Sequence, residues 1–225
     1  MSEFINNVNG SVLNMIVQTA HRTCRFEVTG MDRFYAVASS DQPIVFSSWH
    51  GQSILNMGFF IGHYDTSQIT ILIPDDWRGD ALAVLIKKLG AQPFPVNLTD
   101  EERSSMTTAR RLVQLVRKIQ KGGHAYIMPD GPEGPAYVVK SGATFIAQKA
   151  KAPIVPIGAY NRHGYELNRW DRYSIPYPFS RISIHVGDPF MVPPKADLAE
   201  ANEELANRLH RVTATAIANY YGAGH

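Results

Sequence analysis

The sequence is poor in cysteine, in net charge and in long apolar runs, and each shortage excludes a class of protein. Cys24 is the single cysteine of 225 residues, so the chain has no intramolecular disulfide framework and suits a reducing compartment. A formal net charge of +2 gives no reason to expect a nucleic-acid partner. No stretch approaches the roughly 20 apolar residues that a membrane-spanning helix needs. The first residues carry Glu3 but no lysine or arginine up to Ala20, so we expect no secretory signal peptide.

Several familiar catalytic signatures are also missing. The chain has no G-x-S-x-G nucleophile motif, no Walker A loop and no Rossmann glycine fingerprint. It has no H-E-x-x-H motif and no paired C-x-x-C motif, so we expect no metal site. A serine hydrolase of the usual kind, a P-loop NTPase and a dinucleotide-binding enzyme are therefore disfavoured.

Strand-like and helix-like apolar patterns alternate along the chain, and its hydrophobic content of 44% is ample for a sizeable core. Strands are predicted at 25–28, 44–49, 68–73, 92–96, 124–127, 154–160 and 182–186. Helices are predicted at 2–21, 30–38, 52–61, 82–89, 99–121, 141–150 and from 197 onward. This alternation indicates a single α/β domain with a mostly parallel mixed sheet flanked by helices. Its parts are a helical N-terminal segment at 1–40, an α/β core at 44–193 and a C-terminal helix at 195–221.

The first predicted helix has an apolar side and a neutral polar side. The apolar side is formed, at helical spacing, by Phe4, Val8, Val12, Met15, Ile16 and Thr19. A helix that lies on a membrane surface normally carries lysines on its polar side, and this one carries asparagine and glutamine. We therefore favour a helix that packs on the core, and contact with lipid stays open as the alternative.

A loop rich in proline and glycine, Met128–Pro135, directly follows the strand-like run 124–127. Proline lacks an amide donor and glycine is costly to order, so this composition fits neither a helix nor a sheet interior. Open α/β sheets usually bind ligands at the carboxyl ends of their strands, which is where this loop is expected. The segment is either a tight structural turn or one wall of a binding site.

His50 lies where a predicted buried strand gives way to a helix. An imidazole has an unperturbed pKa of about 6.5, so it can act as a general base near neutral pH. Gly51, which has no side chain, would leave space beside the ring. The alternative is a hydrogen-bonded structural histidine.

Four short segments, taken in order, resemble the lysophospholipid acyltransferase superfamily. More narrowly, they resemble its bacterial branch long carried as a domain of unknown function near the lipid A acyltransferases. The segments are Trp49-His50-Gly51, Pro129-Asp130-Gly131-Pro132-Glu133-Gly134-Pro135, Val138-Val139-Lys140-Ser141-Gly142 and Ala152-Pro153-Ile154-Val155-Pro156-Ile157-Gly158. The resemblance runs from about Ile44 to Pro193, and its most specific part is the Asp-Gly-Pro-x-Gly-Pro segment.

The resemblance implies a glycerol-3-phosphate acyltransferase-like fold and transfer of a fatty acyl group from a thioester to a lipid hydroxyl. The donor would be acyl-CoA or acyl carrier protein, the acceptor a lysophospholipid or related lipid, and His50 the general base. No cofactor besides this co-substrate is expected. Substrate contacts are expected from Trp49, Gln52, Arg78, Gly131, Pro132, Glu133, Gly134 and Lys140. The amides of Gly131 and Gly134 would serve phosphate or an oxyanion. The expected location is cytoplasmic, with peripheral contact at the inner face of the cell membrane left open.

The chain also departs from the superfamily pattern. The fifth position after the histidine, normally an acid that orients the ring, is Leu55, so Asp130 is our first choice for the catalytic partner of His50, with Asp75 or Asp76 second. Glu133 and Asn97 stand where relatives often carry arginine. A carboxylate at 133 would repel a phosphate unless a neighbouring cation pairs with it.

Two other functions therefore stay open. The loss of cations favours a lipid- or phosphate-binding protein without catalytic activity on the same fold. A hydrolase that uses Ser47 or Ser48 with His50 is the third class.

Overall fold

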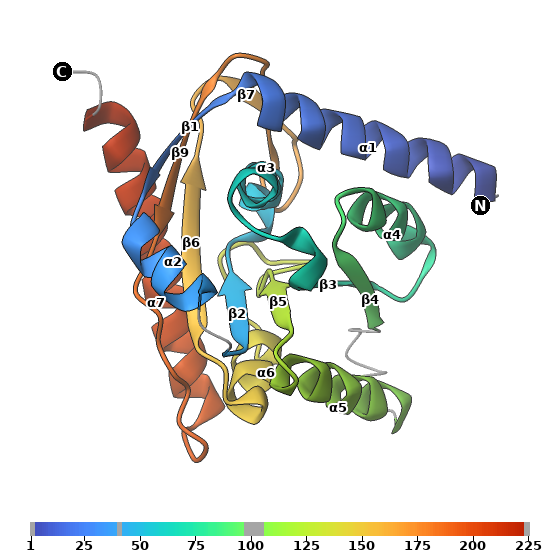
Figure 1. The fold of residues 1–225 in the computed structure, drawn as a ribbon, viewed down its shortest axis with the longest axis vertical. Coiled ribbons are helices and arrows are strands. Elements are labelled where there is room, and N and C mark those ends of the chain that lie inside the picture. The colour runs from blue at the N-terminus through green and yellow to red at the C-terminus, as the bar shows by residue number, and fades with distance from the viewer. Residues whose placement is uncertain (1–2, 40–41, 97–105, 223–225) are drawn as a thin grey trace.

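The chain folds around a seven-stranded sheet with helices on both faces (Figure 1). The computed structural model describes residues 3–39, 42–96 and 106–222. The helices are α1 (Glu3–Thr23), α2 (Met31–Ala38), α3 (Ser53–His63), α4 (Trp77–Lys88), α5 (Met106–Gln120), α6 (Gly142–Ala150) and α7 (Leu198–Gly222), with short 3-10 turns η1 (His50–Gln52) and η2 (Thr66–Gln68). The strands are β1 (Arg25–Thr29), β2 (Ile44–Ser47), β3 (Ile69–Pro74), β4 (Gln92–Val96), β5 (His124–Ile127), β6 (Ile154–Tyr160), β7 (Gly164–Glu166), β8 (Ser174–Pro176) and β9 (Arg181–Val186).

The main sheet has the order β1-β9-β6-β2-β5-β3-β4. Its neighbouring strands are parallel except for β6 and β9, which run antiparallel. The predicted single α/β domain with a mostly parallel mixed sheet is thus confirmed. Strands β2, β5, β3 and β6 all end at one edge of the sheet, which we call the carboxyl edge.

Successive residues of the buried strands point to opposite faces of the sheet and pack into two separate hydrophobic clusters. Phe46 and Tyr126 point into a cluster with α1, α2, α3 and α4, whereas Val45 and Ile127 point into a cluster with α5, α6 and α7. A parallel sheet covered on both faces needs apolar residues on both sides of each strand, which is why these strands read as continuous apolar runs. We call the two sides of the sheet the α4 face and the α5 face.

The reversed strand β9 keeps the connection after β6 at the carboxyl edge. Because β6 ends there and β9 begins there, residues 161–180 need not cross to the opposite edge. They form a small antiparallel hairpin, β7–β8, in which Gly164 pairs with Pro176 and Glu166 with Ser174. This hairpin was not predicted from the sequence.

Helix α1 lies along α4 and α3, and its orientation corrects the sequence prediction (Figure 1). Gly10 faces α4 so closely that a Cβ atom there would lie 2.5 Å from Cβ of Val84. This contact buries Val17 and Ala20 and turns the side with Phe4 and Met15 outward, where these two side chains are 76% and 61% exposed. The predicted apolar side of α1 is therefore largely exposed. No helix among the described residues is long and apolar enough to cross a membrane.

Candidate active site

His50 begins the η1 turn at the carboxyl edge of the sheet, with Ser48 and Trp49 between the end of β2 and the turn. Its side chain is 20% exposed and forms part of the wall of a cavity described below. Strand β2 is buried along its whole length and lies between β5 and β6, so the backbone that presents the histidine is held on both sides. The ring sits at the position where open α/β sheets bind ligands.

The carboxylate that contacts the imidazole is Asp171, in the connection between β7 and β8. Nδ1 of His50 lies 2.7 Å from Oδ2 of Asp171, whose side chain is fully buried. An ionised carboxylate only accepts hydrogen bonds, so Nδ1 carries the proton and Nε2 is left as a proton acceptor. Burial opposes ionisation of Asp171, but the hydrogen bond from His50 and the charge of Arg169 outweigh it and hold the pKa of Asp171 below its usual value.

This contact corrects the predicted role of Asp130. Oδ1 of Asp130 accepts a hydrogen bond of 2.9 Å from the backbone amide of His50, not from its ring, and Oδ2 accepts one from the amide of Tyr137. Burial raises the pKa of Asp130, and these amide hydrogen bonds only partly offset that effect. Asp130 therefore fixes the backbone at His50, while Asp171 orients the ring. The second choices, Asp75 and Asp76, pair instead with Arg111 and Arg78.

The β7–β8 connection covers the histidine from one side. Trp170 lies over the His50 ring with a centroid distance of 5.3 Å, and Tyr173 lies at 5.9 Å. The hydroxyl of Tyr173 in turn accepts a hydrogen bond of 2.9 Å from Ser53. The space beside Gly51 that we expected to be open is occupied, since a Cβ there would lie 2.1 Å from the carbonyl oxygen of Asp171. Gly51 thus lets the Asp171 backbone approach.

The Pro/Gly loop covers the histidine from the other side. A Cβ atom on Gly131 would lie 2.7 Å from Cδ2 of His50, so only glycine fits against the ring at this position. The loop does not offer the two amides that we expected for phosphate or an oxyanion. The amide of Gly131 donates to the carbonyl of Met128, and that of Gly134 donates to the carbonyl of Asp130.

Glu133 has the neighbouring cation that its position requires. Nη1 of Arg78 lies 2.9 Å from Oε1 of Glu133, and Nη2 lies 2.6 Å from Oδ2 of Asp76. The pair removes the expected repulsion of a phosphate by Glu133, but it also leaves Arg78 with two carboxylates. Asn97, the other departure from the superfamily pattern, lies outside the described residues.

A cavity of about 440 Å³ opens beside His50 on the α4 face, and we call it the first cavity. Its wall is mainly aliphatic and includes Leu13 of α1, Met57 of α3 and Leu82 of α4. The polar groups Arg78, Arg169 and His50 also line it. Such a space, apolar with a few polar groups, is typical of sites that bind small molecules or aliphatic chains.

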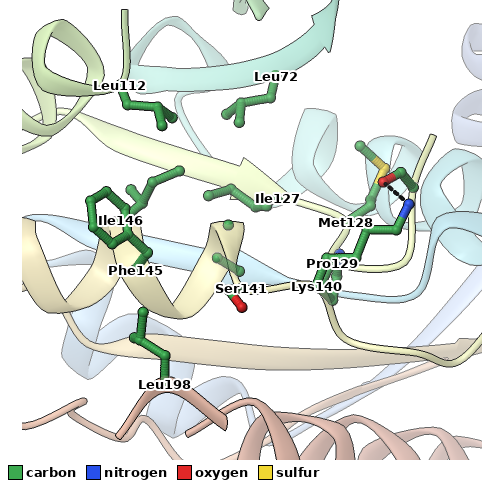
Figure 2. Close-up of a pocket in the computed structure, with 13 residues that line it drawn as sticks. Leu72, Leu112, Ile127, Met128, Pro129, Lys140, Ser141, Phe145, Ile146 and Leu198 are labelled. Carbon is green, nitrogen blue, oxygen red and sulfur yellow. Dashed lines mark hydrogen bonds between the residues drawn. The ribbon is translucent and has the colours of Figure 1, made fainter. Parts of the chain in front are cut away.

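A second cavity of about 280 Å³ lies on the α5 face (Figure 2). Apolar side chains from β3, α5, α6 and α7 surround it, among them Leu72, Leu112, Phe145 and Leu198. Lys140, which was expected to bind substrate, belongs to its wall. Gly131 belongs to the walls of both cavities, so they adjoin next to the His50 ring.

The remaining predicted site residues fall into two groups. Pro132 lines the first cavity, and Gly134 packs closely against Trp170. Trp49 and Gln52 do not line either cavity. Trp49 is buried against Tyr137 and His210, and the Gln52 amide contacts Thr213 and the backbone of Ala159. Both side chains thus pack away from the two cavities, and their contact with substrate stays a prediction.

Neither serine proposed for a hydrolase is placed as a nucleophile. Ser47 and Ser48 are fully buried, and their hydroxyls bond to the carbonyl of Ile127 and the hydroxyl of Tyr126. Within the described part of the chain, no group of three or more His, Cys, Asp or Glu side chains is arranged to hold a metal ion.

Sequence reasoning missed Arg169, Trp170 and Asp171. The available signal was the run of charged and aromatic residues 169–173, in a segment to which no element had been assigned. That segment joins two predicted strands, and connections with such residues often carry function.

Comparison with known proteins shows the fold and the family of the chain. The chain has the fold of the 1-acyl-sn-glycerophosphate (LPA) acyltransferase PlsC from Thermotoga maritima, with a TM-score of 0.59 and 15% identity over 92% of this chain and 79% of that one. It is 30% identical over 174 residues to the uncharacterized protein RP090 of Rickettsia prowazekii (strain Madrid E). The matched region covers 77% of this chain and 75% of RP090. The chain therefore belongs to the same family as RP090. No family model matches it.

Proposed function

We propose that this protein is an acyltransferase of the lysophospholipid acyltransferase superfamily, in the bacterial branch that its sequence resembles. It would move a fatty acyl group from a thioester donor to a hydroxyl of a lysophospholipid or related lipid. The observation that carries the proposal is the His50–Asp171 pair, 2.7 Å apart, beside an apolar cavity. The fold shared with a 1-acyl-sn-glycerophosphate acyltransferase supports it.

The chemistry needs only a base, because a thioester is already activated. Nε2 of His50 accepts the proton of the acceptor hydroxyl as that oxygen attacks the thioester carbonyl carbon. Asp171 keeps the proton on Nδ1 and stabilises the imidazolium that forms. The carbon–sulfur bond then breaks, and the leaving thiolate takes the proton back from the imidazolium. Arg169 lines the same cavity and supplies positive charge near the carbonyl oxygen.

The first cavity would hold the acyl chain that is transferred. Its aliphatic wall suits a hydrocarbon chain, and each methylene buried there stabilises binding by about 0.8 kcal/mol. The donor would be acyl-CoA or acyl carrier protein, with no further cofactor.

Contact with the inner face of the cell membrane is part of the proposal. Phe4, Val8, Val12 and Met15 form an exposed apolar strip on α1, and Trp77, 63% exposed, lies at the start of α4 in the wall of the first cavity. Such a strip fits a protein that takes lipid from a bilayer without spanning it. Vesicle flotation of the full chain and of a Phe4→Ser/Met15→Ser variant tests this, with retained flotation of the variant counting against it.

The decisive test of function is His50→Ala, assayed with labelled acyl donor and a panel of lysolipids. We expect a fall in kcat of about 10²–10⁴, the range that a general base contributes. His163→Ala, an exposed histidine in the chain, is the matched control and should keep wild-type rates. Undiminished transfer by His50→Ala would remove the base from the mechanism.

A lipid-binding protein without activity is the second candidate, favoured by the two carboxylates on Arg78. It predicts lysolipid binding by wild type and by His50→Ala alike, with no release of free thiol from acyl-CoA by either. Thiol release that depends on His50 supports the enzyme.

A further inference from the structure

The second cavity lies across the sheet from the first and has its own apolar wall. Leu112 comes from α5, Phe145 and Ile146 from α6, and Leu198 from α7, all elements of the α5 face (Figure 2). The two cavities share Leu72, Ile127, Met128 and Gly131, at the carboxyl ends of β3 and β5. The two cavities therefore have part of their walls in common, next to the His50 ring.

Lys140 supplies the second cavity with positive charge close to this junction. Its Nζ lies 3.4 Å from the carbonyl oxygen of Gly131, the residue that contacts the His50 ring. It forms no ion pair with any residue that the structure describes. The two cations of the first cavity differ, because Arg78 pairs with Asp76 and Glu133, and Arg169 lies 3.5 Å from Asp171. Among the cations that line the two cavities, Lys140 is thus the least neutralised.

We propose that the second cavity binds the hydrocarbon chain of the acceptor lysolipid, with the anionic head group at Lys140. This inference rests on the proposed function, because it assigns a place to the acceptor of that reaction. The two chains would lie on opposite faces of the sheet, the transferred chain on the α4 face and the acceptor chain on the α5 face. The acceptor hydroxyl meets the thioester where the cavities adjoin, beside His50.

The lining argues against the other long part of the substrates, the pantetheine arm of the donor. That arm carries amides and a hydroxyl, and a buried polar group without a partner costs about 1–3 kcal/mol. Among the described residues of its wall, the second cavity offers polar side chains only at Lys140 and Ser141, and the others are mostly aliphatic or aromatic. A hydrocarbon chain leaves no polar group unpaired there.

The experiment measures kcat/KM for a series of 1-acyl lysophosphatidates of increasing chain length, and for glycerol 3-phosphate, with one donor held constant. For wild type we expect kcat/KM to rise about fourfold for each methylene that the cavity buries, until the cavity is full. Leu112→Trp fills part of the cavity from a half-buried position. It should lower kcat/KM for the longest acceptor about 15-fold, the effect of two methylenes that no longer fit, and leave glycerol 3-phosphate unchanged.

Leu82→Trp is the matched control in the first cavity, from another half-buried leucine. It should change the dependence on donor chain length and leave the dependence on acceptor chain length as in wild type. Should Leu112→Trp unfold, as seen in thermal melting, Leu198→Gln places a polar group in the same cavity and should give the same selective loss. An equal loss with all acceptors, or a raised KM for the donor instead, overturns the inference.

Binding without turnover separates this inference from the proposed function. Calorimetric titration of His50→Ala with lysophosphatidate, without donor, should show affinity that rises with chain length and falls on adding Leu112→Trp. Affinity that is independent of chain length overturns the inference, whatever the transfer assay shows. Absence of transfer by wild type, with chain-dependent binding intact, overturns the acyltransferase proposal and leaves the cavity as a lipid-chain site.

Discussion

Two loops enclose His50, and they act through different parts of the chain. The Pro/Gly loop Met128–Pro135 acts mainly through its backbone path, which brings Gly131 against the ring, and through one carboxylate that fixes the His50 amide. The β7–β8 connection acts through side chains, since Asp171 bonds the ring and Trp170 covers it. A loop whose backbone must follow an unusual path needs proline and glycine, whereas a loop that only presents side chains does not. The Pro/Gly loop is therefore conspicuous in the sequence, and the β7–β8 connection is not.

The largest effect on activity is expected from Asp171, in the β7–β8 connection. Asp171→Asn removes the acceptor that fixes the Nδ1 proton, so kcat should fall by about 10³–10⁴ while KM changes little. Steady-state kinetics across pH measure it, and Asp188→Asn, on an exposed carboxylate, is the control. A large rise in KM with kcat preserved would assign Asp171 to substrate binding instead of to orientation of the ring.

The backbone path of the first loop should matter next. Gly131→Ala places a methyl group 2.7 Å from Cδ2 of His50 and must displace the ring. A displacement of about 1 Å costs roughly 10²-fold in rate. Gly222→Ala meets nothing within 4 Å and should leave kinetics unchanged. If Gly131→Ala retains full activity at an unchanged melting temperature, the contact between Gly131 and the His50 ring does not affect catalysis.

A smaller effect is expected at Glu133, which touches neither the ring nor Asp171. Glu133→Gln frees Arg78 from one of two carboxylates and should lower KM for anionic acceptors by about two- to fivefold, as exposed ion pairs allow. The gain should shrink with added salt. A neutral acceptor alcohol is the internal control, because its KM should not move. A raised KM for the anionic acceptors would mean that Glu133 itself binds substrate.

The smallest effect concerns acid stability, and here the carboxylates of the two loops should act in opposite directions. The pKa of Asp171 is lowered, so Asp171 stabilises the fold above about pH 4 and this contribution is lost as pH falls through its folded pKa. The pKa of Asp130 is raised by burial, so its ionisation disfavours folding, and acidification relieves this cost as the pH falls toward about 4.

Urea unfolding of wild type, Asp171→Asn and Asp130→Asn from about pH 3 to 7 measures both effects, since linkage relates the pH slope to proton uptake. The free energy of unfolding of wild type minus that of Asp171→Asn should rise with pH. The same difference taken with Asp130→Asn should fall with pH. Slopes of the same sign would mean that the two carboxylates do not have the distinct environments described above.

The sequence predicted most of the frame and only half of the candidate site. The strands at 124–127 and 154–160 are found at those residues because buried strands have an unmistakable apolar pattern. His50 and the Pro/Gly loop lie together at one edge of the sheet, as expected of residues at adjacent strand ends. Asp171 could not be paired with His50 in advance, because that pairing depends on where the chain returns after β6, which local patterns do not specify. For the same reason α1 was recognised as a helix while the side that it exposes was misjudged.

The reversal of β9 has a consequence for how this site can vary among relatives. A connection that leaves and re-enters the sheet at one edge can change in length or composition without altering the order of the strands. The acid that orients the histidine is carried on such a replaceable connection, instead of on the helix that follows the histidine. Relatives with the same site should therefore carry an aspartate in the connection before the last strand of the sheet, and need not carry one at a fixed distance from the histidine.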